Sequence, residues 1–255
     1  MICFLALAGF VQAQSPNDPN EGTTLTPDSS SGTYLFSWWG HAGRTYFIQQ
    51  SEDLQTWSYV PIIETGADQT IQWGFSSSAD KLFLRVKYTD VATSDPFNDD
   101  FDGDGVSNWD ELQQGSDPNN YYSQPGANGP VTILPALNIL SGNNQTSDPV
   151  TFAANPLLIQ VTDSATGLPL SNAPLTFSVS QGGGTLTTAN TPVAQQYDSL
   201  QMRTDNDGYA VVYQGTTAAV YYLQPAGEGI TSQITATAGT AFPAQFTVTT
   251  NYMSA

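Results

Sequence analysis

The chain is poor in the residues on which many redox and metal sites depend. Its 255 residues include one cysteine, Cys3, and one histidine, His41. Disulfide frameworks and cysteine-ligated zinc sites need several cysteines, so both are excluded. A single histidine in the turn-like sequence Gly-His-Ala-Gly has no evident partners for a catalytic triad. We therefore interpret His41 as a turn residue.

Basic residues are almost as scarce. Only five Lys or Arg stand against 23 Asp or Glu, which gives a formal net charge of −18. A surface with this charge repels the phosphates of nucleic acids and the headgroups of anionic membranes. We therefore predict that neither is a partner.

Long apolar runs are confined to the beginning of the chain. Residues 2–11 are apolar, and Val-Gln-Ala before Gln14 suits a cleavage site, so residues 1–13 are predicted to be a signal peptide. The usual positive n-region is missing, and the alternative is a buried N-terminal strand. No later stretch is long enough to span a bilayer. Residues 14–32, rich in Ser, Thr, Pro, Asn and Asp, are expected to be a flexible leader. These features favour a secreted bacterial protein.

Acidic residues are concentrated between residues 91 and 130, where eight acids and no base occur. Within this segment, residues 100–111 read Asp-Phe-Asp-Gly-Asp-Gly-Val-Ser-Asn-Trp-Asp-Glu. This sequence fits the calcium-loop pattern D-x-[DN]-x-[DN]-G-x5-E at every fixed position. The alternative, a solvated acidic linker, does not account for the spacing, the glycine and the final glutamate together.

Each position of the pattern has a role in a shell of six to eight hard oxygen ligands. Gly105 allows the sharp turn of the loop, because glycine adopts positive φ without strain. The predicted Ca²⁺ ligands are the carboxylates of Asp100, Asp102, Asp104 and Glu111, the backbone carbonyl of Val106, and Asn108 directly or through water. Glu111 is expected to close the shell with both oxygens.

A short helix is predicted over residues 108–114. Ser107 is a suitable N-cap, and Gly115 is a suitable C-terminal stop. Pro96 disfavours a helix before the loop. Over residues 95–118 the segment resembles the calcium loops of thrombospondin type 3 repeats and dockerins. Dockerins carry two loops and this chain has one, so the resemblance implies calcium binding without a cohesin partner. A lone extracellular loop is expected to bind with a dissociation constant of about 10⁻⁴ to 10⁻³ M.

Residues 33–90 are predicted to form a small β-domain. Alternation places Phe36 and Trp38 on one face of a strand, and Ile71 and Trp73 on one face of another. Trp38 and Trp73 fit the inward pattern, and at least one of Trp38 and Trp39 faces outward. Five short strands suggest a fibronectin type III-like sandwich, and residues 43–57 resemble modules of secreted bacterial proteins. The predicted strands cover residues 33–39, 44–50, 57–63, 69–75 and 81–88.

Residues 131–255 are predicted to form a second β-sandwich. Its sequence contains the blocks Leu-Ile-Gln-Val-Thr-Asp, Ala-Pro-Leu-Thr-Phe-Ser-Val, Thr-Asp-Asn-Asp-Gly and Ile-Thr-Ala-Thr-Ala, in that order. These blocks resemble the group 1 bacterial immunoglobulin-like domain of invasin and intimin stalks, which implies an extracellular spacer or adhesin module. Strands are predicted over 156–163, 173–180, 209–213, 232–238 and 244–250, with 131–140 as a first strand or an extended lead-in.

Together these observations predict an all-β chain with two β-sandwiches joined by a calcium-binding loop with one short helix. The sandwiches cover residues 33–90 and 131–255, and the acidic linker covers 91–130. The acid pairs Glu52/Asp53 and Asp205/Asp207 lie in turn contexts, where Asp bonds to the backbone, so no enzymatic activity is predicted.

The predicted function is that of a secreted or cell-surface modular protein, a structural or adhesion spacer whose hinge is stiffened by calcium. The expected partner is a protein or polysaccharide of the cell surface or matrix. Two alternatives stay open. One is a glycan-binding accessory module that uses exposed tryptophans. The other is an N-terminal part of a larger surface protein whose activity lies elsewhere.

Overall fold

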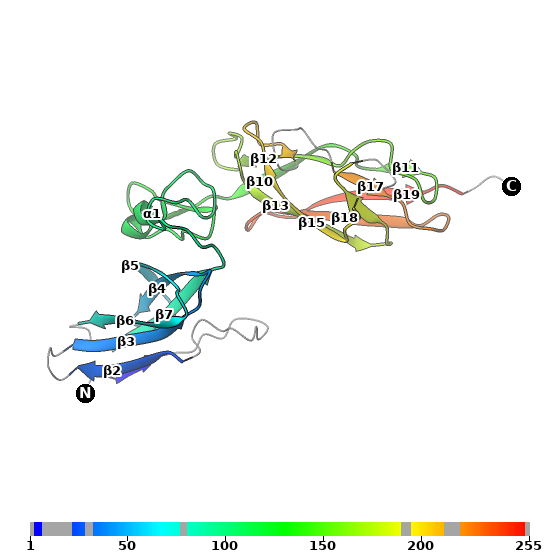
Figure 1. The fold of residues 1–255 in the computed structure, drawn as a ribbon. Coiled ribbons are helices and arrows are strands. Elements are labelled where there is room, and N and C mark those ends of the chain that lie inside the picture. Colours follow the sequence, from blue (N-terminus) through cyan, green and yellow to red (C-terminus); the bar gives the residue numbers. More distant parts are fainter. Residues whose placement is uncertain are drawn as a thin grey trace. The chain divides into compact units, whose positions relative to one another are not determined.

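The computed structural model describes residues 3–6, 22–28, 33–76, 81–189, 195–211 and 220–252. Strands dominate these residues, and the only helix described among them is α1 (Asn108–Gln114), so the predicted all-β class is confirmed (Figure 1). The chain divides into two compact units, Met1–Val131 and Thr132–Ala255. Among the described residues, no helix is long and apolar enough to cross a membrane.

Two sheets form the first unit. One has the strand order β2-β3-β6, and the other has the order β1-β7-β4-β5. The five strands expected between residues 33 and 90 are all present, within two residues of the predicted ends. The strands are β1 (Cys3–Ala6), β2 (Thr24–Asp28), β3 (Thr33–Gly40), β4 (Thr45–Ser51), β5 (Ser58–Thr65), β6 (Gln69–Phe75) and β7 (Lys81–Thr89).

The core of this unit is built by the alternation of side chains along the strands. Phe36 and Trp38 of β3 are buried together with Tyr46 and Ile48 of β4. Successive side chains of a strand point to opposite faces, so every second residue enters this core. Burial of side chains of this size is the main term that stabilises the fold.

The tryptophans divide as their phase predicts, with one exception. Trp38 is buried, whereas Trp39 is 45% exposed. Trp73 shares the inner face with Ile71, yet it is 36% exposed. The expectation that Trp73 is an inward core residue is wrong in this respect, because β6 lies at the edge of its sheet and the indole N–H donates to Glu64 Oε1 at 2.8 Å. Glycan binding by the exposed rings stays a prediction.

The region expected to be a flexible leader contains a strand. β2 pairs antiparallel with β3, and Leu25 packs against the core, so the expectation is wrong for Thr24–Asp28. Pro27 is compatible with a strand at this position because β2 is an edge strand. β1 pairs in parallel with β7, as in the N-terminal-strand alternative. The rest of residues 1–13 lies outside the described residues, and the signal peptide stays a prediction.

The second unit contains a six-stranded sheet with the order β11-β19-β18-β13-β15-β16 and two smaller pairs, β10-β12 and β14-β17. β11 runs parallel to β19, the last strand. β8 (Ser123–Gln124) pairs with β9 (Val131–Thr132) near the boundary between the units. The other strands are β10 (Pro135–Ser141), β11 (Gln145–Ser147), β12 (Leu158–Asp163), β13 (Pro174–Gln181), β14 (Thr185–Thr187), β15 (Ser199–Thr204), β16 (Ala210–Val211), β17 (Tyr221–Leu223), β18 (Thr231–Thr237) and β19 (Ala244–Thr250).

Large apolar side chains are fully buried in the second unit. Ile159 and Val161 of β12, Phe177 of β13 and Phe246 of β19 have no exposed surface. The rings of Phe177 and Phe246 lie 6.1 Å apart between centroids. This unit therefore has a hydrophobic core of its own.

The acidic segment of the first unit packs on the outer face of the sheet that contains β4 and β5. Phe47 lies on this face, opposite to the side chains that enter the sandwich core. It forms a second buried cluster with Tyr59, Ile63 and Leu112 of α1, and Phe101 of the acidic segment packs against it. The Phe47 and Phe101 rings meet edge to face at 6.0 Å. The calcium-loop segment is thus a third layer of the first unit.

Candidate metal centre

The helix that follows the loop begins and ends where the sequence predicts. Ser107 is the N-cap, and its hydroxyl accepts a hydrogen bond from Asp110 N. Gly115 ends the helix with φ 83°, and its N–H donates to the carbonyl of Glu111. A left-handed residue at this position is easiest for glycine, because it has no Cβ. These caps place Glu111 in the first turn of α1.

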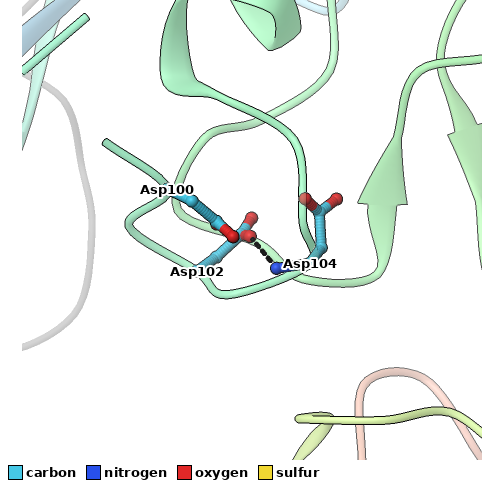
Figure 2. A group of neighbouring side chains, drawn as sticks. All are labelled: Asp100, Asp102 and Asp104. Carbon is cyan, nitrogen blue, oxygen red and sulfur yellow. Dashed lines mark hydrogen bonds between the residues drawn. The ribbon is translucent and has the colours of Figure 1, made fainter. Parts of the chain in front are cut away.

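The loop holds its three aspartate carboxylates by hydrogen bonds to its own backbone. Ligand oxygens of Asp100, Asp102 and Asp104 lie within 4.8 Å of one another (Figure 2). Such short-range bonds fix each side chain against the turn that follows it. The acceptors are Asp100 for Gly103 N at 2.6 Å and Gly105 N at 2.8 Å, Asp102 for Asp104 N at 3.1 Å, and Asp104 for Val106 N at 2.8 Å.

Glu111 is the most deeply buried acid of the segment, with no exposed surface. Its Oε1 accepts a hydrogen bond from Ser116 Oγ at 3.0 Å. Its Oε2 is buried and has no donor among the residues that the structure describes, and the same holds for Asp104 Oδ2. Buried oxygens without donors are unfavourable, and a bound cation would satisfy them. These residues therefore fit a hard cation.

Burial, with repulsion from neighbouring acids, raises the pKa values of Asp102, Asp104 and Glu111. Burial, reinforced by the charges of Asp102 and Asp104, raises the pKa of Glu111 to about 9. Burial and the charge of Asp104 raise the pKa of Asp102 to about 7. Burial also raises the pKa of Asp104. The anionic forms are thus destabilised without a cation, and a divalent ion at this point would reverse the effect.

Asn108 stays a predicted ligand, directly or through water, and its side chain also makes two hydrogen bonds in this structure. Its Oδ1 accepts from Phe101 N at 3.1 Å, and its Nδ2 donates to Pro96 O at 2.8 Å. The fully buried amide therefore ties the start of α1 to the chain before the loop. Val106 donates its N–H to Asp104, and its carbonyl stays a predicted ligand. The structure thus brings three of the six predicted ligands, Asp100, Asp102 and Asp104, into one cluster. It places Glu111 near enough for the charges of Asp102 and Asp104 to act on it.

The sequence did not predict the contacts that hold Glu111 and the turn after α1 in place. Ser116 is fully buried and bonds to Glu111. Tyr59 of β5 donates its hydroxyl to Asp117 Oδ1 at 2.6 Å. The only signal in the sequence was the phase of Tyr59, which places it on the outer face of its strand. The partner lies 58 residues further along the chain, and a local pattern does not reveal it.

The raised pKa values predict a stability that depends on pH. Asp102 and Glu111 bind protons more tightly in the folded than in the unfolded chain, where carboxyl pKa values are about 4. Without calcium, the free energy of unfolding of the first unit should therefore fall as pH rises from about 4 to about 9. Calcium binds the deprotonated acids, so its stabilising effect should grow over the same range.

Thermal melts followed by tryptophan fluorescence test this prediction. All five tryptophans belong to the first unit, so the signal does not include the second. Melts at about pH 5 and about pH 9, with EDTA or with calcium, give the two trends, because the upper pH lies above the raised pKa of Asp102 and reaches that of Glu111. A calcium effect of equal size at both pH values would contradict the prediction.

Comparison with known proteins adds a family assignment for this segment. Residues 100–120 match the model of the bacterial TSP3 repeat. The resemblance to thrombospondin type 3 repeats, a calcium-binding type of repeat, is therefore confirmed for the loop and helix α1. The match covers the aspartate cluster, Glu111 and the closing turn at Ser116.

Similarity to solved structures extends over most of the chain but is weak. The adhesin InvE of Yersinia pseudotuberculosis has 15% identity and a TM-score of 0.33, with 90% of this chain and 59% of the adhesin covered. A β-glycosidase from Bacteroides vulgatus has 11% identity and a TM-score of 0.30, with 89% and 24% covered. This chain thus spans only part of either protein, and scores this low carry no functional argument. No curated protein matches the sequence.

Proposed function

We propose that this chain is an extracellular modular protein that binds calcium through its TSP3 repeat and acts as a structural or adhesion spacer. One observation carries the calcium assignment. Three aspartates converge within 4.8 Å, and the adjacent repeat residue Glu111 is fully buried with an oxygen that has no donor among the described residues. An anionic cluster of this kind is stabilised by a cation and destabilised without one.

The kind of ligand atoms in the cluster favours calcium over other metals. The cluster offers carboxylate oxygens, and the carbonyl of Val106 is a predicted further oxygen ligand. Hard oxygen donors suit Ca²⁺ or Mg²⁺, whereas zinc and copper sites usually include histidine or cysteine. Ca²⁺ accepts six to eight ligands in flexible geometry, which suits a loop whose ligands alternate along the chain. Asp100, Asp102, Asp104 and Glu111 would hold the ion, with the carbonyl of Val106 and with Asn108 directly or through water.

The spacer role is supported by the rest of the chain. Both units are β-rich, and each has its own core. The sequence blocks of the second unit resemble domains of bacterial adhesin stalks, and this resemblance implies a spacer or adhesin module. A weak calcium site suits an extracellular location, because extracellular modules work at dissociation constants of about 10⁻⁴ to 10⁻³ M.

Calorimetric titration with CaCl₂ tests the proposal. We expect one saturable site with a dissociation constant of about 10⁻⁴ to 10⁻³ M, lost in Asp104→Asn. Asp163→Asn in the second unit is a matched control. Asp163 Oδ1 accepts from Ala165 N at 2.9 Å, much as Asp104 Oδ1 accepts from Val106 N at 2.8 Å. The control should bind calcium as the unchanged chain does. Absence of saturable binding up to about 10 mM, ten times the upper expected constant, would refute the proposal.

A further inference from the structure

A chain of polar contacts connects the metal segment to strand β5. Tyr59 Oη donates to Asp117 Oδ1 at 2.6 Å. Asp117 directly follows Ser116, whose hydroxyl donates to Glu111 Oε1 at 3.0 Å. Tyr59 is only 9% exposed, and Ser116 and Glu111 are fully buried. The contacts thus run from the sheet to the acid that would complete the metal site.

Two further hydrogen bonds hold Asp117 in place beside Tyr59. Its N–H donates to Ser123 Oγ at 3.0 Å, and its Oδ1 also accepts from Asn119 N at 3.1 Å. Hydrogen bonds to a charged acceptor are shorter and stronger than those between neutral groups. The turn after α1 is therefore anchored to the sheet at Asp117, immediately beside Ser116.

The apolar contacts of the same region also connect the residues beside Glu111 to the sheet. Leu112, the residue after Glu111, packs in the cluster that contains Tyr59 and Phe47. Glu111 thus lies between a helix position fixed by Leu112 and a turn fixed by Tyr59. Both supports belong to the outer face of the sheet of the first unit.

We propose that Tyr59 is a positioning residue of the metal site, and that ion binding is thermodynamically linked to the folding of the first β-sandwich through it. The inference rests on the proposed calcium function. The sheet orients Glu111 for the ion through Asp117 and Ser116. By linkage, the ion stabilises the sheet by the same free energy with which the sheet improves ion binding.

Tyr59→Phe in the full chain tests the inference, with Tyr46→Phe as the matched control. Tyr46 lies in the same sheet, on the face toward the sandwich core, and its hydroxyl accepts from His41 N at 2.8 Å. Both variants lose one hydroxyl from the same sandwich, but only Tyr59 contacts the metal segment. We expect calcium affinity to fall about fivefold to tenfold in Tyr59→Phe, as for a typical coupling between sites, and to be unchanged in Tyr46→Phe.

A second readout separates positioning from general loss of stability. The calcium-induced rise in the melting temperature of the first unit, followed by tryptophan fluorescence, should shrink in Tyr59→Phe and stay full in Tyr46→Phe. If Tyr59→Phe does not fold, Asp117→Ala replaces it. If Tyr59→Phe and Asp117→Ala both fold, a chain carrying both substitutions should lose little more calcium affinity than either single variant, because Tyr59 and Asp117 act through one contact.

The outcomes separate this inference from the calcium proposal. If the unchanged chain does not bind calcium, the proposed function fails and the inference falls with it. If the chain binds calcium but Tyr59→Phe binds as tightly, calcium binding stands and the positioning role is overturned. Equal losses of affinity in Tyr59→Phe and Tyr46→Phe would also overturn it, because they would reflect a weakened sandwich.

Discussion

A chain carrying Glu111→Gln is expected to bind calcium about 100-fold more weakly than the unchanged protein, because one charged ligand of the shell is lost. The variant keeps the local structure, since the amide oxygen of glutamine can still accept the hydrogen bond from Ser116. Calorimetric titration measures the loss. Asp110→Asn, an exposed acid of the same helix turn outside the predicted ligand set, is the matched control and should bind normally.

The same substitution should stabilise the calcium-free protein. Burial raises the pKa of Glu111 to about 9, so the folded chain must either hold a proton there or bury a charge, and glutamine requires neither. In EDTA at about pH 8, we expect the first unit of Glu111→Gln to melt about 5 °C higher than that of the unchanged chain, a shift of about 1 kcal/mol. In saturating calcium the order should reverse. A variant that melts lower under both conditions would show that the glutamate stabilises the fold without an ion.

Leu112→Ala is expected to lower the free energy of unfolding of the first unit by about 2–5 kcal/mol, the usual cost of a large cavity in a core. Leu112 is 3% exposed and packs with Phe47, Tyr59 and Ile63. The loss should appear as a lower denaturation midpoint in tryptophan fluorescence. The second unit, which has no tryptophan, should keep its own transition by circular dichroism.

Leu168→Ala provides the control for this substitution. Leu168 belongs to the second unit and is 64% exposed, so its truncation should change stability by less than about 0.5 kcal/mol. If the acidic segment were a free linker without tertiary contacts, Leu112→Ala would lower the free energy of unfolding as little as Leu168→Ala does. A large difference between the two variants would establish that the TSP3 segment is part of the first folded unit.

The candidate site could be predicted from the sequence because its determinants are local. The aspartates recur at alternate positions of one loop, and the caps Ser107 and Gly115 adjoin the helix that they bound. The five strands between residues 33 and 90 could be predicted as well, since aromatic and β-branched residues alternate in runs of seven to nine residues that are separated by turns.

The support of the site could not be predicted, because it depends on contacts between distant residues. The phase of Phe47 and Tyr59 shows that they leave the sandwich core, but it does not show what covers them. Leu112 and Asp117 cover them from more than 50 positions away. Asn108 also fits the ligand pattern by spacing alone, and only the fold shows its amide bonded to Phe101 and Pro96.

The strands that were missed are short or polar. β11, β14 and β17 have three residues each, which is too few for periodicity to emerge. β15 does alternate, with Leu200 and Met202 buried, but polar residues surround them and weaken the pattern. β2 contains Pro27, which argues against a strand unless its place at a sheet edge is known.

The short strand β11 gives the second unit a particular response to mechanical force. A pull between the two ends of this unit passes through β10, which pairs antiparallel with β12, before it reaches β11 from its N-terminal side, and it reaches β19 from its C-terminal side. Because the strands run parallel, with Gln145 beside Val248 and Ser147 beside Thr250, the pull slides one strand along the other. The hydrogen bonds between them, and that from Asn251 N to Ser147 O, then bear the load together and do not open one after another. Under the proposed spacer role, the contact between β11 and the last strand would resist stretching of the second unit.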